Sequence, residues 1–477
     1  AILLAFSKKQ ADSRKRWLAN YDRNDILDIT EQNLTFHDFV YKELIHFSND
    51  DNIRSIPHVL DGLKPSQRKV MYTLLLSKNN DEMKVSQLAG SVSLKTSYHH
   101  GEASLLQTIV SMAQNFVGSN NTNLLVPVGQ FGSRLMGGKD SASARYIFTK
   151  LNEISRNIFN KDDDFQLNFL NDDGIKIEPE YYLPIIPTIL INGAEGIGTG
   201  YSTNVPKFKL KDVKKTLINK LKNNKFILIH PNYENFKGKI TKIDKSNYYS
   251  EGIYEINKNK KLFIIKELPI GTWTENYKKK IDEMLDEGKI IKKIYADNTD
   301  KKVYFEIKLY DYGMDMLNSM SHNEILDYFK LRKKILLTNM HCFSGQGKIK
   351  KYNSANDILK EFYEIRLQAY IKRKSYLIKQ YKRQILIENS KYIFIKAVID
   401  QKLKLHLLED DKIKKRLDKM DLYRKEGYEY LLNIPFKQMT KKNLNRLKDR
   451  IKNLWDEFKI IKKTSEKQMW LNDLDKL

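Results

Sequence analysis

Six apolar residues near the C-terminal end recur at the spacing of a coiled-coil seam, and this pattern limits the possible folds more than any other feature. They lie 3, 4, 3, 4 and 3 positions apart. Residues at this spacing line one side of a long helix, which must bury that side against a second long helix. The six are Leu444, Leu447, Ile451, Leu454, Phe458 and Ile461.

A second long helix is predicted over Asn356–Ile387, where apolar residues form one stripe in a highly charged stretch. One helix leaves and the other returns, so together they predict an antiparallel coiled-coil arm. The residues between them, about 391–436, are expected to form a small globular tip.

The composition favours a multidomain protein with an anionic partner. The chain has 477 residues, which is too long for one core and suggests two to four domains. There are 84 lysines and arginines against 59 acidic residues, a net charge of +25, and nucleic acid is the first candidate for such an excess. Compositional bias is the alternative, because many lysines lie among asparagines, as in NKNKK.

Several classes of protein are excluded by simple counts. The single cysteine, Cys342, excludes an internal disulfide framework and a cysteine zinc cluster. No apolar run approaches the length of a membrane span. The run Asp162–Asp164 is expected to be a solvated loop rather than a metal site, because nothing orients three adjacent carboxylates towards one ion.

The stretch Gln130–Thr149, QFGSRLMGGKDSASARYIFT, carries the candidate chemistry. A glycine-rich loop is followed by small residues, and then Arg145 and Tyr146 stand side by side. A phenol can attack the phosphorus of a phosphodiester, and a guanidinium can stabilise the charge that develops on the phosphoryl oxygens. The alternative for Arg145 and Tyr146 is the edge of a strand or helix, with the ring half buried.

Four long stretches in order resemble eukaryotic-type type IIA DNA topoisomerases. Besides QFGSRLMGGKDSASARYIFT they are NIRSIPHVLDGLKPSQRKVMY (Asn52–Tyr72), QLAGSVSLKTSYHHGEASLLQTIVSMAQNFVGSNN (Gln87–Asn121) and EPEYYLPIIPTILINGAEGIGTGYST (Glu178–Thr203). Weaker similarity extends from Ala1 to the C-terminus. The resemblance implies the part of such an enzyme that breaks and reseals DNA. Tyr146 would attack one strand and retain its 5′ end as a phosphotyrosine.

The resemblance also implies roles for other residues. Arg145 and His100 would assist Tyr146 at the cleavage site, whereas His99 is expected to be structural. A zinc site at these adjacent histidines is rejected, because the sequence shows no second pair of ligands for the metal. Five basic residues would contact DNA, although a surface ion pair is the alternative for each arginine. These five are Arg54, Lys64, Arg68, Arg134 and Lys139.

Ile197 is singled out by its position between glycines in GAEGIGTG (Gly193–Gly200). This segment lacks the spacing of a nucleotide-binding loop. By resemblance, Ile197 would insert between base pairs and kink the duplex. A core isoleucine in a tight turn is the alternative.

The expected fold is a multidomain α+β protein in four parts. Residues 1–33 would be the tail of a Toprim domain and a connector, and residues 34–165 a winged-helix domain with helices over Val85–Ser93 and Gly101–Val117. Residues 166–352 would form a mixed α/β tower that supports bent DNA, with strands predicted in GKITKID, IYEIN, KLFIIKELP and KVYFEIKLY. Residues 353–477 would form the coiled-coil arm and a helical dimerisation tip.

The resemblance implies double-stranded DNA as substrate, homodimerisation through the tip and a nuclear location. A helix pair without a partner is the alternative for the tip. A free phenol has a pKa of about 10, so a tyrosine nucleophile needs help to lose its proton. Mg²⁺ would help, held by a Toprim domain expected to lie largely outside this sequence, and ATP would act in another missing domain. A non-enzymatic, architectural winged-helix DNA-binding protein is the rival function.

Overall fold

The computed structural model describes residues 1–28, 30, 33–403 and 409–477, which divide into two compact units. The first comprises Ala1–Arg366 together with Asp473–Leu477, and the second comprises Leu367–Asn472. The protein is a multidomain α+β structure with small antiparallel sheets, which confirms the predicted class. None of the described helices is both long enough and apolar enough to cross a membrane.

The first unit begins with a helical segment built around Trp17, Val40 and Ile45. A short π-helix, Phe39–Leu44, continues directly into α4, so the chain from Phe36 to Ser55 is one helical rod. The helices are α1 (Ile2–Phe6), α2 (Ala11–Ala19), α3 (Phe36–Asp38) and α4 (Ile45–Ser55).

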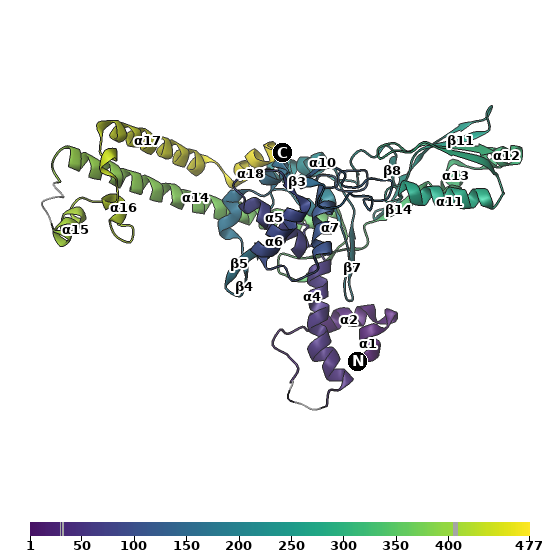
Figure 1. Ribbon diagram of the computed structural model, residues 1–477, viewed down its shortest axis with the longest axis horizontal. Helices are drawn as coiled ribbons and strands as arrows, with labels where there is room; N and C mark the ends of the chain where they lie inside the picture. Colours follow the sequence, from purple (N-terminus) through teal and green to yellow (C-terminus); the bar gives the residue numbers. More distant parts are fainter. Residues whose placement is uncertain (29, 31–32, 404–408) are drawn as a thin grey trace. The chain divides into compact units, whose positions relative to one another are not determined.

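Next comes a group of three helices and a three-stranded sheet, which Figure 1 shows together. The two helices predicted around the Val85 and Gly101 stretches are confirmed, and the second buries Leu105, Ile109 and Met112. The strand order is β1-β3-β2. The elements are α5 (Pro65–Leu76), α6 (Val85–Thr96), α7 (Glu102–Ala113), β1 (Met83–Lys84), β2 (Leu125–Val128) and β3 (Phe148–Leu151).

Short elements then pack around this group. The expectation of a solvated loop at Asp162–Asp164 is wrong for its central residue, because Asp163 is buried in a short 3₁₀ helix, Lys161–Gln166, and pairs with Arg366 at 2.6 Å. Further elements are α8 (Glu153–Ile158), β4 (Phe169–Asp172), β5 (Ile175–Pro179), α9 (Thr188–Asn192), β6 (Ala194–Ile197), β7 (Ser202–Val205), α10 (Leu210–Asn223), β15 (Met340–Phe343) and β16 (Ile349–Tyr352).

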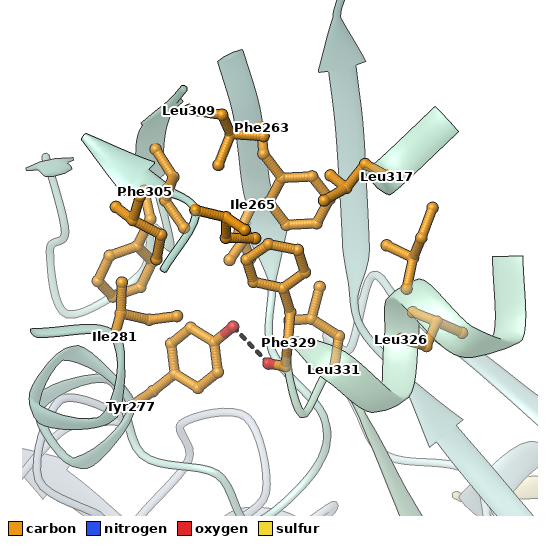
Figure 2. Close-up of a cluster of buried hydrophobic side chains, with 14 of the residues drawn as sticks. Phe263, Ile265, Tyr277, Ile281, Phe305, Leu309, Leu317, Leu326, Phe329 and Leu331 are labelled. Carbon is orange, nitrogen blue, oxygen red and sulfur yellow. Dashed lines mark hydrogen bonds between the residues drawn. The ribbon is translucent and has the colours of Figure 1, made fainter. Parts of the chain in front are cut away.

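The largest sheet of the first unit has four strands and packs against three helices. Aromatic and aliphatic side chains fill the space between them, and the hydroxyl of Tyr277 donates to the carbonyl of Phe329 at 2.7 Å (Figure 2). The order is β10-β11-β13-β12. The elements are β10 (Ile253–Asn257), β11 (Leu262–Glu267), β12 (Ile291–Ala296), β13 (Phe305–Leu309), α11 (Thr274–Asp286), α12 (Asp311–Ser319) and α13 (His322–Tyr328).

A second, three-stranded sheet of this region has the order β14-β9-β8. Its strands are β8 (Lys239–Lys242), β9 (Asn247–Glu251) and β14 (Arg332–Leu336). Strands β8, β10, β11 and β13 lie in the four stretches where the sequence predicts strands, so that prediction is confirmed.

The second unit contains the two long helices that the sequence predicts. Helix α14 (Ala355–Ile399) lies mostly in this unit, and Figure 1 shows it beside α17 (Lys441–Lys463). Ile385 of α14 packs against Leu454 and Phe458 of α17. A separate core around Phe394, Leu417 and Leu431 forms the tip. The remaining helices are α15 (Asp410–Asp418), α16 (Glu429–Leu432) and α18 (Glu466–Asp475), the last of which ends in the first unit.

Candidate functional site

The loop between β2 and β3, residues 129–147, is held in shape by its own polar contacts; we call it the tyrosine loop. The amide of Gln114, just after α7, donates to the carbonyls of Phe131 and Gly138, at 2.9 and 3.2 Å. Asp140 accepts bonds from both the backbone N–H and the hydroxyl of Ser133. A Cβ on Gly132 would lie 2.6 Å from Gly138, so the backbone crosses itself too closely for a larger residue.

The tyrosine loop also rests on the start of α11. The backbone N–H groups of Thr274 and Glu275 donate to the carbonyls of Arg134 and Leu135, at 3.3 and 3.0 Å. These are N–H groups of the first helical turn, which have no partner within the helix. A Cβ on Gly137 would lie 2.4 Å from the ring of Trp273, so the loop lies flat against that indole.

Arg145 and Tyr146 lie in a turn that is anchored on both sides. The N–H groups of Ser86 and Val85, at the start of α6, donate to the carbonyls of Ala144 and Ile147, at 3.2 and 3.0 Å. Ile147 is buried, whereas Arg145 is exposed and the Tyr146 side chain is 76% exposed. The half-buried edge position that was the alternative for Tyr146 is therefore excluded. A rigid support presents the phenol to solvent.

The adjacent histidines differ in their surroundings. His100 is exposed, lies edge-on to Tyr98 with ring centroids 5.4 Å apart, and precedes the first turn of α7. His99 contacts Asp172 at 3.0 Å, and this hydrogen bond lowers the pKa of the Asp172 carboxyl. His99 thus joins α6 and its following turn to the β4–β5 hairpin, in line with a structural role.

Three of the five basic candidates are accessible. Arg54, near the end of α4, is exposed and has Asp51 at 3.5 Å, which is an exposed pair of little energetic weight. Lys139 is exposed on the tyrosine loop. The ammonium of Lys64 donates to the carbonyl of Glu195 at 2.7 Å, and partial burial lowers its pKa.

The other two, Arg68 and Arg134, are buried inside the protein. Arg68 forms a 2.8 Å bond to Asp61 and a 2.6 Å bond to the carbonyl of Leu63. Arg134 forms a buried ion pair with Glu267 at the end of β11. Their guanidinium groups are engaged with protein partners, so their placement favours support of the site over contact with a ligand at its surface.

Ile197 ends β6 at the tip of the β6–β7 hairpin, where the segment Gly198–Tyr201 forms the turn. Its side chain is 85% exposed. The alternative of a core isoleucine is therefore excluded. The GAEGIGTG segment forms a strand and a turn, and the carbonyl of Glu195 within it contacts Lys64, so this hairpin and the Lys64 turn lie together.

Sequence reasoning missed the residues that hold these groups in place. Gln114, Glu267 and Asn52 make contacts that span 17, 133 and 147 positions along the chain. No local pattern marks a partner at such a distance. The Asp61–Arg68 ion pair is different, because its two residues are only seven positions apart. A carboxylate just before a turn and an arginine on the following helix could have indicated this pair from the sequence.

Comparisons with known proteins cover the whole chain. Residues 54–475 match the A-subunit family of DNA gyrase/topoisomerase IV, and residues 1–52 match the C-terminal associated domain of TOPRIM. A mitochondrial DNA topoisomerase 2 of Dictyostelium discoideum is 40% identical over 489 residues, which is all of this chain and 37% of the relative. DNA topoisomerase 2-alpha of Gallus gallus is 40% identical over 519 residues, covering 99% of this chain and 33% of the relative.

A solved structure agrees in three dimensions. The crystal structure of the Plasmodium falciparum topoisomerase II DNA-binding, cleavage and re-ligation domain superposes with a TM-score of 0.90 at 38% identity, and the match covers 100% of this chain and 68% of that one. The chain therefore spans about a third of the length of the curated relatives named above, and about two thirds of this solved domain.

Proposed function

The chain belongs to the type IIA DNA topoisomerases, and from this premise we propose that it binds duplex DNA and breaks and reseals it through Tyr146. The observation that carries the proposal is the exposed Tyr146 beside Arg145 on the rigid tyrosine loop. An architectural DNA-binding protein, the rival, has no need of a supported and solvent-facing phenol next to a guanidinium.

The proposed reaction is a transesterification. The phenolic oxygen of Tyr146 forms a bond to a backbone phosphorus, and the bond from that phosphorus to the 3′ oxygen breaks. The phenol proton is lost, the 3′ oxygen leaves as a hydroxyl, and the 5′ end remains on the tyrosine. One phosphate ester replaces another, so resealing is the reverse step and needs no external energy. Arg145 stabilises the developing charge, and His100 donates a hydrogen bond at the same site.

The roles of the basic residues divide according to their burial. We assign DNA backbone contacts to Arg54, Lys64 and Lys139, which are at least partly accessible. Arg68 and Arg134 act as positioning residues, because each lies in a buried ion pair. Removing one member of such a pair would leave the other charge buried and uncompensated.

We further propose domain roles that go beyond the observed α+β architecture. Helices α6 and α7 with the β1-β3-β2 sheet act as a winged helix, in which the tyrosine loop is the wing. The sheets from β8 to β14 act as a tower for bent DNA. The tip of the second unit, built around Phe394, Leu417 and Leu431, is a dimer interface.

Topoisomerase II proteins use ATP and Mg²⁺, and we assign neither site to this chain. Among residues 1–28, 30, 33–403 and 409–477, no group of three or more histidine, cysteine or acidic side chains could hold a metal ion. The carboxylate of the tyrosine loop, Asp140, already accepts two bonds from Ser133. We propose that both sites lie in those parts of the longer relatives that this sequence does not match. A nuclear location is likewise a proposal, and the name of one relative places that protein in mitochondria.

Covalent trapping tests the proposed function. The full-length protein is incubated with supercoiled plasmid and Mg²⁺, denatured, and digested with protease. We expect linear DNA whose 5′ ends carry a peptide, and mass spectrometry should map that peptide to Gln130–Thr149. A protein that binds the plasmid tightly but never forms an adduct would support the architectural rival instead.

Ile197→Ala is expected to reduce DNA bending and to leave folding almost unchanged. The side chain is exposed, so its removal creates no cavity in the core. A wedge side chain inserts between two base pairs, keeps them partly unstacked and so kinks the duplex. Alanine is too short to do this, so the bend should decrease. The bend is measured by energy transfer between dyes at the two ends of a duplex, at saturating protein. A bend equal to that of the wild type would contradict the wedge role.

A further inference from the structure

The tip of the β6–β7 hairpin is fixed to helix α4 by side-chain hydrogen bonds. The Asn52 amide Nδ2 donates to the carbonyl of Thr199 at 3.0 Å. The Thr199 hydroxyl in turn donates to the Asp51 carboxylate at 3.0 Å. Asn52 is only 2% exposed, so its bond to the turn is protected from water.

The two glycines that flank Ile197 lie directly against α4. A Cβ on Gly196 would lie 2.0 Å from the carbonyl oxygen of Ser55, and a Cβ on Gly198 would lie 2.3 Å from Oδ1 of Asn52. The backbone on both sides of Ile197 therefore touches the helix. The exposed isoleucine projects from a hairpin whose supporting strand and turn have little room to shift.

Asn52 makes this contact although one of its polar atoms has no partner. Its Oδ1 is buried and has no hydrogen-bond partner among the residues that the structure describes. Rotating the amide would not help, because Oδ1 would then face the Thr199 carbonyl, which is also an acceptor. An unsatisfied buried acceptor is unfavourable for folding, and such groups call for an explanation beyond stability.

The other side of the turn lies against α2. A Cβ on Gly200, whose φ is +76°, would lie 3.1 Å from Cβ of Arg14. The ammonium of Lys15 is 5.9 Å from the centroid of the Tyr201 ring. Helices α2 and α4 share the core around Trp17, so the turn Gly198–Tyr201 contacts the packed N-terminal helical segment on both of its sides.

We propose that Asn52 is a positioning residue for DNA bending. It holds the turn Gly198–Tyr201 against α4, so that Ile197 enters the base stack at a fixed depth. Because α2 and α4 pack together, the position of the whole N-terminal segment sets the position of the wedge. This inference rests on the proposed function, in which Ile197 kinks the duplex.

Asn52→Ala tests the inference, with Asn49→Ala as its matched control three residues earlier in α4. A fluorescent adenine analogue at the kinked step reports unstacking, and end-to-end energy transfer reports the bend. At saturating DNA, Asn52→Ala should lose more than half of both signals, while Asn49→Ala behaves as the wild type. DNA affinity should change by less than about twofold, because backbone contacts elsewhere remain.

Thr199 provides a second, independent pair of variants. Thr199→Val removes the hydroxyl that bonds to Asp51 but keeps the shape of the side chain, and it should weaken both signals. Thr199→Ser keeps the hydroxyl and should restore them. Leu454→Ala, in the packing of α17 against α14, lowers the melting temperature without touching the hairpin, and it should leave both signals unchanged.

Three outcomes would overturn the inference. Wild-type unstacking and bending in Asn52→Ala would show that the bond from Asn52 to Thr199 does not position Ile197. An equal loss in Leu454→Ala would show that bending follows stability alone. If Ile197→Ala itself left the bend unchanged, the wedge role would fail and the inference with it. A loss in Ile197→Ala without one in Asn52→Ala would refute only the positioning role.

Discussion

Tyr146→Phe in the full-length enzyme should bind DNA with near-native affinity and form no covalent adduct. The phenyl ring keeps its place on the tyrosine loop, and the exposed hydroxyl has no protein partner among the described residues, so its loss should not disturb folding. The nucleophilic oxygen is removed completely, and no other atom of the side chain can replace it. Filter binding measures affinity, and denaturation followed by protease digestion measures the adduct.

Tyr98→Phe is the matched control for this change. Tyr98 is a partly exposed tyrosine that contacts the His100 ring, so the variant also removes one phenolic oxygen near the proposed site. It should still form the adduct. If Tyr146→Phe formed as much adduct as the wild type, another residue would have to be the nucleophile, and peptide mapping would identify it.

Arg145→Ala should reduce the rate of cleavage by about 10²- to 10³-fold, the usual effect of removing one donor that faces developing charge. The side chain is exposed, so the melting temperature should stay close to that of the wild type. The rate of adduct formation under single-turnover conditions isolates the chemical step from DNA binding.

Arg145→Lys separates charge from geometry. Lysine keeps the positive charge but lacks the planar fork that can donate two parallel hydrogen bonds to a phosphate. An intermediate rate is expected, above that of Arg145→Ala and below that of the wild type. A cleavage rate in Arg145→Ala equal to the wild-type rate would remove this residue from the mechanism.

The regular elements of this protein could be predicted because their signals are local. The seam at Leu447, Leu454 and Phe458 indicated the returning helix, and its partner helix was readable from one apolar stripe. The β-rich stretches indicated the strands of the sheets. In each case, the residues that determine the element lie within that helix or strand itself.

The surroundings of the candidate residues could not be predicted in the same way. Arg134 looks like a loop arginine available to a ligand, yet its partner Glu267 lies 133 positions away. Asp163 looks like part of a solvated acidic run, yet it is buried in an ion pair with Arg366, which lies 203 positions away. Burial of a charged side chain depends on a counter-ion that only the tertiary structure supplies.

The contacts between the tyrosine loop and the region of β11 and α11 have a consequence for biosynthesis. The loop depends on Glu267, Trp273 and the first N–H groups of α11, all of which are translated more than a hundred residues after it. Contacts this distant in sequence form late, because closing a long chain segment is entropically costly. On the ribosome, the loop around Tyr146 therefore lacks this part of its support until these later residues have emerged. The site around Tyr146 is therefore completed only after the chain has been synthesised well past the tyrosine loop itself.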